Sequence, residues 1–312
     1  MLTIFSTPKP FKGHIKTIQT NAFQSWVSLR PACEVILFGD EEGSAEVAAE
    51  LGIRHIPEVG CNEYGTPLIS SMFEIAQDVA SYQLMCYVNA DIILMSDFLL
   101  AIRQIQWQSF LLVGQRWDVD IKDLLDFSKL DWQEQLRTRL AKEGNLHAPS
   151  GLDYFVFSHG MYRDIPPFAI GRPGWDNWMV YWARSLKVPV IDATRVITAI
   201  HQNHDYSHHP EGKAGVWEGP EAERNRELLG GDYYAFGLLD APYRLTPTGL
   251  KSTMTMSPRY LAHRTLRLPE MHPHWIPLVQ IIKILRYLYF SLRSRAAVLK
   301  RSMQKHRLPD TS

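Results

Sequence analysis

The first third of the chain alternates short apolar runs with longer amphipathic segments, and this alternation limits the folds that it can adopt. Four runs are typical of buried strands, at residues 2–5, 34–40, 53–59 and 84–88. Three segments between them repeat apolar side chains at helical spacing, at residues 14–29, 44–51 and 67–81. Strands and helices that alternate in this order form parallel sheets with right-handed crossovers. We therefore expect an α/β, Rossmann-like fold with a mostly parallel central sheet flanked by helices, in which Ser44 caps the second helix and Pro67 opens the third.

The order of elements is mixed further along the chain. Strand-like runs occupy residues 109–121 and 152–158, and residues 176–186 have the apolar spacing of a helix. Residues 189–209 contain one strand followed by a His-rich loop. The sequence shows no internal repeat and no low-complexity linker. It predicts one large domain over residues 1–240, an irregular extension over residues 241–275 and a helical tail over residues 276–312.

The charge is balanced over the whole chain but not along it. Lysine plus arginine and aspartate plus glutamate both number 33, which gives no electrostatic sign of nucleic-acid binding. Residues 276–312 hold eight basic residues and one acid among many apolar ones. Such a segment is too charged to cross a bilayer but suits the headgroup region of anionic lipids. We expect peripheral contact with an anionic membrane or, as an open alternative, packing on the protein body or on a second subunit.

The cysteines and the N-terminal residues bear on the compartment. Cys33, Cys61 and Cys86 are odd in number and widely spaced, which favours reduced thiols in the cytoplasm. The first residues lack the basic and apolar regions of a signal peptide, and no run reaches the roughly 18 apolar residues of a membrane span. We expect a cytoplasmic protein, peripheral at the inner membrane face if the tail binds lipid.

Polar side chains follow several of the predicted strands. Thr7 comes after the first strand, Asp40 ends the second, and Asn89 and Asp91 interrupt the apolar stretch "YVNADIIL". Ligands of parallel sheets bind beyond the carboxyl ends of the strands. The carboxylate of Asp91 suits Mg²⁺ or Mn²⁺, which prefer oxygen ligands. By itself, Asp91 is equally compatible with a helix cap or a turn.

A His-rich segment supplies candidate imidazole ligands. His201, His204, His208 and His209 fall within nine residues of one another. Mn²⁺ accepts imidazole nitrogen beside carboxylate oxygen. The segment has no CxxC or HExxH pattern, so it gains meaning only together with Asp91. If the fold joins the two segments, they form a site for Mn²⁺ or Mg²⁺, in which we favour His204 slightly over His201.

Asp176 lies at the start of the helical segment, in "GRPGWDNW", directly after a loop rich in glycine and proline. A carboxylate at this place can accept a proton from a bound hydroxyl group. The alternative is that Asp176 caps the helix and that the neighbouring tryptophans belong to the core.

These motifs resemble those of the nucleotide-diphospho-sugar transferase superfamily, the type A glycosyltransferases, and within it a group of bacterial and plant glycosyltransferase-like proteins. "YVNADIIL" is similar to the D-x-D metal motif, "GWDNW" to the acidic motif on the acceptor side, and "IHQNHDY" to the late metal-binding histidine. The resemblance covers residues 2–205. It departs from the family at Asn89, which stands where the first Asp of D-x-D is expected, and at "WDN", which has one acid.

The resemblance implies a metal-dependent transfer of a sugar from a nucleotide-diphosphate donor to a hydroxyl acceptor, with lipid-linked and cell-envelope glycans as candidate acceptors. It implies that Asp176 is the catalytic base. It also implies that Asp91, with His204 or His201, holds Mn²⁺ or Mg²⁺ at the diphosphate. Contacts to the nucleotide or the sugar are implied for Thr7, Asp40, Asn89, Arg116 and Asp118.

Two other functions stay open. Sugar-nucleotide nucleotidyltransferases share this fold class, but they carry a Gly-rich, basic phosphate loop after the first strand, where residues 6–14 contain one Gly. A non-catalytic nucleotide-sugar binding protein is conceivable because Asn89 leaves less negative charge for a metal ion. The product nucleotide would distinguish the two enzymes, and release of any product would distinguish an enzyme from a binder.

Overall fold

The computed structural model describes residues 1–205, 212–231, 235–253 and 273–275, together with residues 277, 280, 281 and 284. The chain divides into two compact units, Met1–Met254 and Thr255–Ser312. The second unit contains the short 3₁₀ helix η3 (Pro273–Trp275). Apart from four single residues, the basic tail expected over residues 276–312 lies outside the described residues, so its membrane contact and the domain boundaries stay predictions. Within the described part of the chain, no helix is both long and apolar enough to cross a membrane.

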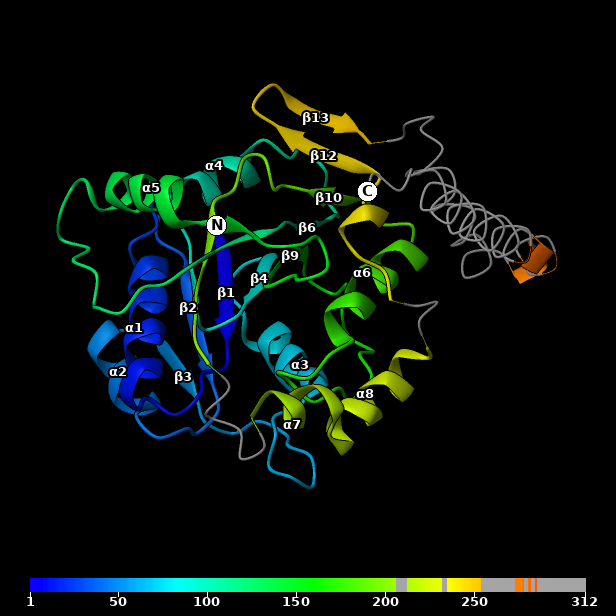
Figure 1. The fold of residues 1–312 in the computed structure, drawn as a ribbon, viewed down its shortest axis with the longest axis horizontal. Helices are drawn as coiled ribbons and strands as arrows, with labels where there is room; N and C mark the ends of the chain where they lie inside the picture. Colours follow the sequence, from blue (N-terminus) through cyan, green and yellow to red (C-terminus); the bar gives the residue numbers. More distant parts are fainter. Residues whose placement is uncertain are drawn as a thin grey trace, which may run out of the picture. The chain divides into compact units, whose positions relative to one another are not determined.

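A nine-stranded sheet forms the centre of the first unit (Figure 1). Parallel pairing joins β3-β2-β1-β4 on one side and β6-β10-β12 on the other, while β9 is antiparallel to both β4 and β6 between them. The mostly parallel α/β sheet expected from the sequence is therefore confirmed. Its strands are β1 (Leu2–Ser6), β2 (Glu34–Phe38), β3 (Arg54–Ile56), β4 (Leu84–Val88), β6 (Leu111–Val113), β9 (Tyr154–Ser158), β10 (Val190–Asp192), β12 (Tyr243–Thr246) and β13 (Gly249–Ser252).

A second sheet of four strands has the order β5-β11-β7-β8. Its strands are β5 (Ile92–Ile93), β11 (Ala199–Gln202), β7 (Arg116–Val119) and β8 (Asn145–Leu146). The prediction of one strand and a His-rich loop in residues 189–209 is wrong on this point, because His201 lies in strand β11. Ile200 of that strand is buried in an apolar cluster of the small sheet, and the alternation of a strand turns His201 to the opposite face.

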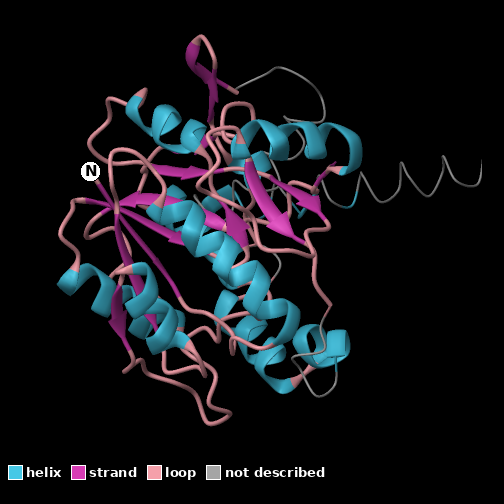
Figure 2. Cartoon of the chain, turned by 90° about the vertical axis from the view of Figure 1, so that its left-hand side faces the viewer, coloured by secondary structure: helices cyan, strands magenta, loops and turns pink. Residues whose placement is uncertain are grey.

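Helices cover both faces of the large sheet (Figures 1 and 2). Because successive side chains of a strand point to opposite faces, Ile4 packs in one core with Trp26, while Phe5 packs in the other with Phe73. The first core includes α1, α2 and α4, and the second includes α3, α6 and α8. The helices are α1 (Gly13–Val27), α2 (Ser44–Leu51), α3 (Ile69–Val79), α4 (Ser96–Arg103), α5 (Trp132–Glu143), α6 (Trp175–Ser185), α7 (Gly212–Glu218), α8 (Pro220–Leu229) and the 3₁₀ helix η2 (Leu238–Asp240).

Two predicted helix starts differ from the structure. Ser44 is the first residue of α2, and the capping position is Gly43, with a φ of 90°. A Cβ atom at Gly43 would lie 2.8 Å from Cβ of Phe11, so both the backbone angle and the space require glycine. Helix α3 begins at Ile69, because Pro67 forms an antiparallel bridge with Cys61 instead of a helical turn.

Candidate active site

The turn that carries Asp91 lies between β4 and β5 and is held from two sides. The backbone N–H of Asn89 donates to the carbonyl oxygen of Asp153 at 2.9 Å. From helix α1, Nε1 of Trp26 donates to the carbonyl oxygen of Ile92 at 2.9 Å. These contacts fix the backbone on both sides of Asp91, at the carboxyl end of a central strand, which is where the sequence predicts a ligand site.

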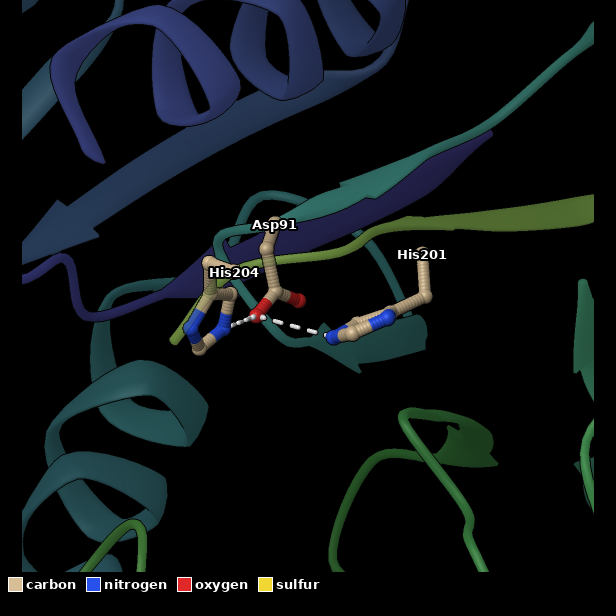
Figure 3. A group of neighbouring side chains, drawn as sticks. All are labelled: Asp91, His201 and His204. Carbon is tan, nitrogen blue, oxygen red and sulfur yellow. Dashed lines mark hydrogen bonds and ion pairs between the residues drawn. The ribbon is translucent and has the colours of Figure 1, made fainter. Parts of the chain in front are cut away.

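Asp91, His201 and His204 form a candidate metal triad (Figure 3). Oδ2 of Asp91 lies 3.1 Å from Nε2 of His204 and 3.7 Å from Nε2 of His201. One ligand atom from each residue lies within 4.8 Å of the other two. Strand pairing explains the arrangement, because His201 pairs with Ile92, the residue after Asp91, and His204 follows the end of β11. The structure thus brings together the three residues that the sequence proposes as metal ligands.

The chemistry of the triad fits a divalent ion. One carboxylate and two imidazoles are a donor set that Mn²⁺ accepts. Oδ1 of Asp91 is buried and has no hydrogen-bond partner among the described residues, so one strong acceptor is left for another ligand. The 3.1 Å between Asp91 and His204 is close to the roughly 3 Å that separates neighbouring ligand atoms on an octahedral ion with bonds of about 2.1 Å.

The electrostatics of the triad favour the charged carboxylate. Burial alone would raise the pKa of Asp91, but His201 and His204 outweigh it and hold that pKa well below its usual value. Burial alone would lower the pKa of His201, but Asp91 and Asp118 outweigh it and raise that pKa. The carboxylate of Asp91 is therefore kept in its charged form.

The buried amide of Gln202 is a structural support that the sequence analysis missed. Its Nε2 donates to the carbonyl oxygens of Asp91, at 3.1 Å, and of Ile18, at 2.7 Å. Its Oε1 accepts from Nδ2 of Asn21 at 2.9 Å. The amide pair therefore ties helix α1 to the turn of Asp91. Both segments contain further amides, Gln19 and Gln24 in α1 and Asn203 after β11, so the sequence does not indicate which amides are buried or which residues pair.

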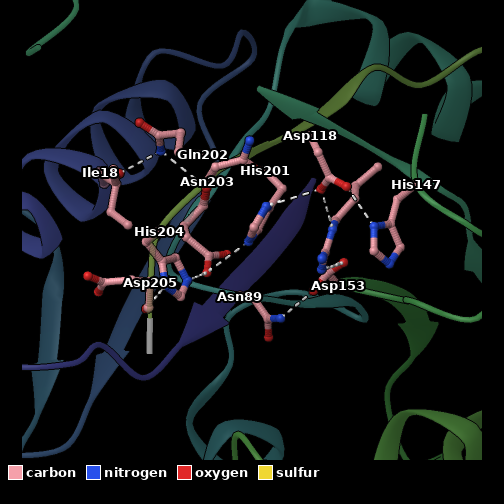
Figure 4. Close-up of polar contacts among 12 residues, drawn as sticks. Ile18, Asn89, Asp118, His147, Asp153, His201, Gln202, Asn203, His204 and Asp205 are labelled. Atoms are coloured by element: carbon pink, nitrogen blue, oxygen red, sulfur yellow. Dashed lines mark hydrogen bonds and ion pairs between the residues drawn. The ribbon is translucent and has the colours of Figure 1, made fainter. Parts of the chain in front are cut away.

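Asp118 lies next to Nδ1 of His201, whereas Asp91 lies next to Nε2 of the same ring (Figure 4). Asp118 lines neither of the two pockets described below. Its Oδ1 accepts from Nε of Arg116 at 2.9 Å and lies 3.2 Å from Nδ1 of His201, while its Oδ2 lies 2.6 Å from Nδ1 of His147. Burial would raise the pKa of Asp118, but His201, His147 and Arg116 outweigh it and lower that pKa. The contact with nucleotide or sugar predicted for Asp118 stays a prediction.

Asp153 connects the two predicted residues Asn89 and Arg116. Its Oδ1 accepts from Nδ2 of Asn89 and its Oδ2 from Nη1 of Arg116, both at 2.6 Å. Oδ1 of Asn89 in turn accepts from the hydroxyl of Tyr87 at 2.8 Å. The amide of Asn89 is thus held as a donor to a carboxylate, a role that an aspartate at this position could not perform. The sequence analysis did not single out Asp153 or His147.

The first of two pockets beside the triad, which we call the strand-end pocket, has a volume of about 350 Å³. Thr7 lines this pocket, and its hydroxyl oxygen is buried without a hydrogen-bond partner among the described residues. Asp40 is exposed and does not line the pocket, whereas its neighbour Glu41 does. The polar residues that line it are Thr7, Lys9, Gln19, Glu41, Thr66, Tyr87, Asn89, Asp91, Arg172 and His204.

The second pocket, which we call the helix pocket, has a volume of about 580 Å³ and lies at the first turn of α6. Asp176 is on its wall, and burial, reinforced by Asp153, raises the pKa of this carboxyl group to about 6. The lining residues common to both pockets are Asn89, Asp91, Gly171, Arg172, His204 and Val216. The helix pocket is also lined by Arg116, His147, Asp153, Asp176, Asn177, His201 and Trp217.

Lys9 and Arg172, two cations that line the strand-end pocket, are not among the site residues predicted from the sequence. Arg172, whose side chain is 11% exposed, donates from Nε to Oε2 of Glu221 at 3.0 Å, and Nδ2 of Asn62 donates to Oε1 of the same carboxylate at 2.6 Å. Burial lowers the pKa of Lys9, and Arg172 acts in the same direction while Asp91 opposes it. A bound anion next to Lys9 would oppose this lowering of its pKa, whereas Arg172 already has the carboxylate of Glu221 as a partner.

No protein-family model and no curated protein matches the chain. Among solved structures, the chain is similar to S. aureus TarS 1–349 in complex with UDP-GlcNAc, with 14% identity and a TM-score of 0.31 over 40% of this chain and 37% of that one. It is also similar to glucosyl-3-phosphoglycerate synthase from Mycobacterium tuberculosis in complex with Mn²⁺, UDP and glucosyl-3-phosphoglycerate. That match has 13% identity and a TM-score of 0.44 over 73% of this chain and 78% of the other.

Both proteins are type A glycosyltransferases, the class whose motifs the sequence resembles. The chain covers well under two thirds of the TarS chain. At such identities and TM-scores, the likeness carries no conclusion about activity or substrate.

Proposed function

We propose that the protein is a metal-dependent glycosyltransferase, which moves a sugar from a nucleotide-diphosphate donor to a hydroxyl acceptor. The observation that carries the proposal is the position of the triad on the wall between two pockets. Lys9 lines one pocket, a carboxyl group with a raised pKa lines the other, and Arg172 lines both. A reaction that joins an anionic donor to a hydroxyl acceptor needs these two environments on either side of one reacting carbon.

The residues of the chain take separate parts in this reaction. The bond between the anomeric carbon and the diphosphate oxygen breaks, and its electron pair stays on the leaving diphosphate. A new bond forms between the anomeric carbon and the acceptor oxygen, and the acceptor proton passes to the carboxylate of Asp176. Asp176 suits this part because its pKa of about 6 leaves it deprotonated at neutral pH but basic enough to take a proton.

Asp91, His204 and His201 would hold a divalent ion, which when bound offsets the charge of the diphosphate as a Lewis acid. Lys9 and Arg172 add fixed positive charge on the same side. Thr7 lines the strand-end pocket and would contact the nucleotide part of the donor there. Mn²⁺ is the preferred ion because two of the three ligands are imidazoles.

The proposal is tested by incubating the purified chain with a panel of nucleotide-diphospho-sugars, with Mn²⁺, with Mg²⁺ and with EDTA. We expect metal-dependent release of a nucleoside diphosphate from at least one donor. Production of pyrophosphate from a sugar phosphate and a nucleoside triphosphate would instead show a nucleotidyltransferase. Donor binding without any release, in the presence of candidate acceptors, would show a binding protein and overturn the proposal.

A further inference from the structure

His201 lies between two carboxylates. Its Nε2 is 3.7 Å from Oδ2 of Asp91, and its Nδ1 is 3.2 Å from Oδ1 of Asp118 (Figure 4). The contact with Asp118 has the distance of an ion pair, although its angle is not that of a hydrogen bond. Among the described residues, Nδ1 of His201 has no other polar contact. The two ring nitrogens therefore have different neighbours, one inside the triad and one outside it.

The small sheet sets this arrangement through its register. Strand β7 lies between β11 and β8, and Asp118 pairs with His201 on one side and with Asn145 on the other. His147 follows two residues after Asn145, and its backbone N–H donates to the carbonyl oxygen of Arg116 at 2.9 Å. Three neighbouring strands thus place His201, Asp118 and His147 in one row, which leads from the triad to the wall of the helix pocket.

Asp118 receives more donors than a neutral side chain could serve. Arg116, His147 and His201 all approach its two oxygens, and its side chain is 17% exposed. An asparagine at this position would keep one acceptor oxygen and bring two N–H donors, so it could not serve the same three partners. The position therefore requires a carboxylate.

We propose that Asp118 is a positioning residue, which orients His201 so that Nε2 faces Asp91 and the metal, and which fixes His147 at the helix pocket through its second oxygen. An N–H at Nδ1 that faces a carboxylate leaves the lone pair of Nε2 free for a metal ion. The inference rests on the proposed metal site and adds a residue that acts on it through His201.

The test compares Mn²⁺ binding by wild type, Asp118→Asn, Asp118→Glu, His147→Gln and the control Asp126→Asn, measured from the electron paramagnetic resonance signal of free Mn²⁺. We expect Asp118→Asn to lose about 10–100-fold in Mn²⁺ affinity. Asp118→Glu keeps the charge but moves the carboxylate, so we expect a smaller loss. His147→Gln, which changes one partner of Asp118, should lose less affinity than Asp118→Asn, and the exposed Asp126→Asn should stay within about twofold of wild type.

A second measurement separates orientation from general destabilisation. In the metal-free protein labelled with ¹⁵N at histidine, at a pH high enough that His201 is neutral, two-bond proton–nitrogen spectra should show the Nδ1–H tautomer of His201 in wild type and its loss in Asp118→Asn. Equal Mn²⁺ affinity of wild type, Asp118→Asn and Asp118→Glu would overturn the positioning role and leave the metal site standing. An unchanged tautomer in Asp118→Asn would also overturn it. Wild type that binds no Mn²⁺ would overturn the metal site itself.

Discussion

The strand-end pocket and the helix pocket share the wall that carries the triad, but they differ in the charged groups that belong to one pocket alone. Lys9 and Glu41 line only the strand-end pocket, and burial together with Arg172, which lines both pockets, lowers the pKa of Lys9. Asp153 and Asp176 line only the helix pocket, and the nearness of Asp153 helps to raise the pKa of Asp176. The proposed function therefore assigns the anionic donor to the side of Lys9 and the proton transfer to the side of Asp176.

The largest expected effect comes from the shared wall. Asp91→Ala removes the carboxylate of the triad, and we expect it to abolish metal-dependent transfer, a loss of roughly 10³–10⁴-fold if the ion contributes several kcal/mol to the barrier. Transfer is measured as release of nucleoside diphosphate in Mn²⁺. The matched control is Asp78→Ala, which removes an exposed carboxylate. Near-normal turnover of Asp91→Ala with unchanged metal dependence would contradict the role of Asp91 as a metal ligand.

The next effect concerns the helix pocket alone. Asp176→Asn removes the base, and we expect kcat to fall by roughly 10²–10³-fold while the Kd of the donor stays within about twofold. The Kd is measured by calorimetry with donor and Mn²⁺. A comparable loss of donor affinity would instead assign a structural part to Asp176.

The same carboxyl group sets the pH dependence of the wild type. Only the deprotonated form accepts a proton, and its pKa of about 6 lies above the ordinary value. The rate should therefore be constant above this pKa and fall about tenfold per pH unit below it. Asp176→Asn should lack this acidic limb. An acidic limb that survives in the variant would mean that another group titrates.

The two imidazoles of the triad should differ. His204 lies 3.1 Å and His201 3.7 Å from the same oxygen of Asp91, so His204 is better placed to share an ion with it. We expect each alanine variant to lose Mn²⁺ affinity, by about 10–100-fold, with the larger loss for His204→Ala. Titration with Mn²⁺ measures both. If neither variant loses affinity, the imidazole ligands lie elsewhere.

A smaller effect should appear on the strand-end side alone. Lys9→Met removes one of the two cations, and we expect roughly tenfold weaker binding of a nucleoside diphosphate, because a charged hydrogen bond contributes about 1.5–3 kcal/mol. The matched control is Lys12→Met, an exposed lysine three residues away whose side chain is 66% accessible. If Lys9→Met and Lys12→Met bind the nucleoside diphosphate with equal affinity, Lys9 does not contribute to anion binding in the strand-end pocket.

The part of the site that the sequence predicts is the part built from local pattern. Asp91 follows a strand whose apolar run is visible in the sequence, and Asp176 begins a helix with clear periodicity. The sequence predicts a loop at His201, because strand β11 forms only by pairing with β5 and β7, which are distant in sequence. Short strands that depend on such pairing leave little local signal.

The supporting groups were missed for the same reason. His147 comes from the segment between α5 and β9, which has no apolar periodicity, and Asp153 lies in the strand-like run 152–158, whose pattern predicts the strand but not the partners of its carboxylate. Their roles depend on contacts with Asn89 and Asp118, and those contacts exist only in the folded sheet. The fold class was predictable because each strand and helix of the first third carries its own pattern, whereas a hydrogen-bond network between distant segments does not.

The last expected effect is on the stability of the fold and concerns Asn89, which lines both pockets. Asn89→Asp restores the acid expected in the D-x-D motif, but it places a carboxylate 2.6 Å from Oδ1 of Asp153. We expect the variant to lose about 1–3 kcal/mol of unfolding free energy, because a hydrogen bond becomes a repulsive contact. In the double variant Asn89→Asp/Asp153→Asn, the amide introduced at position 153 can donate to the carboxylate introduced at position 89 and still accept from Arg116, so most of the loss should be recovered. Urea denaturation measures the free energy of unfolding of both variants. If Asn89→Asp alone is as stable as wild type, the hydrogen bond from Asn89 to Asp153 does not stabilise the fold.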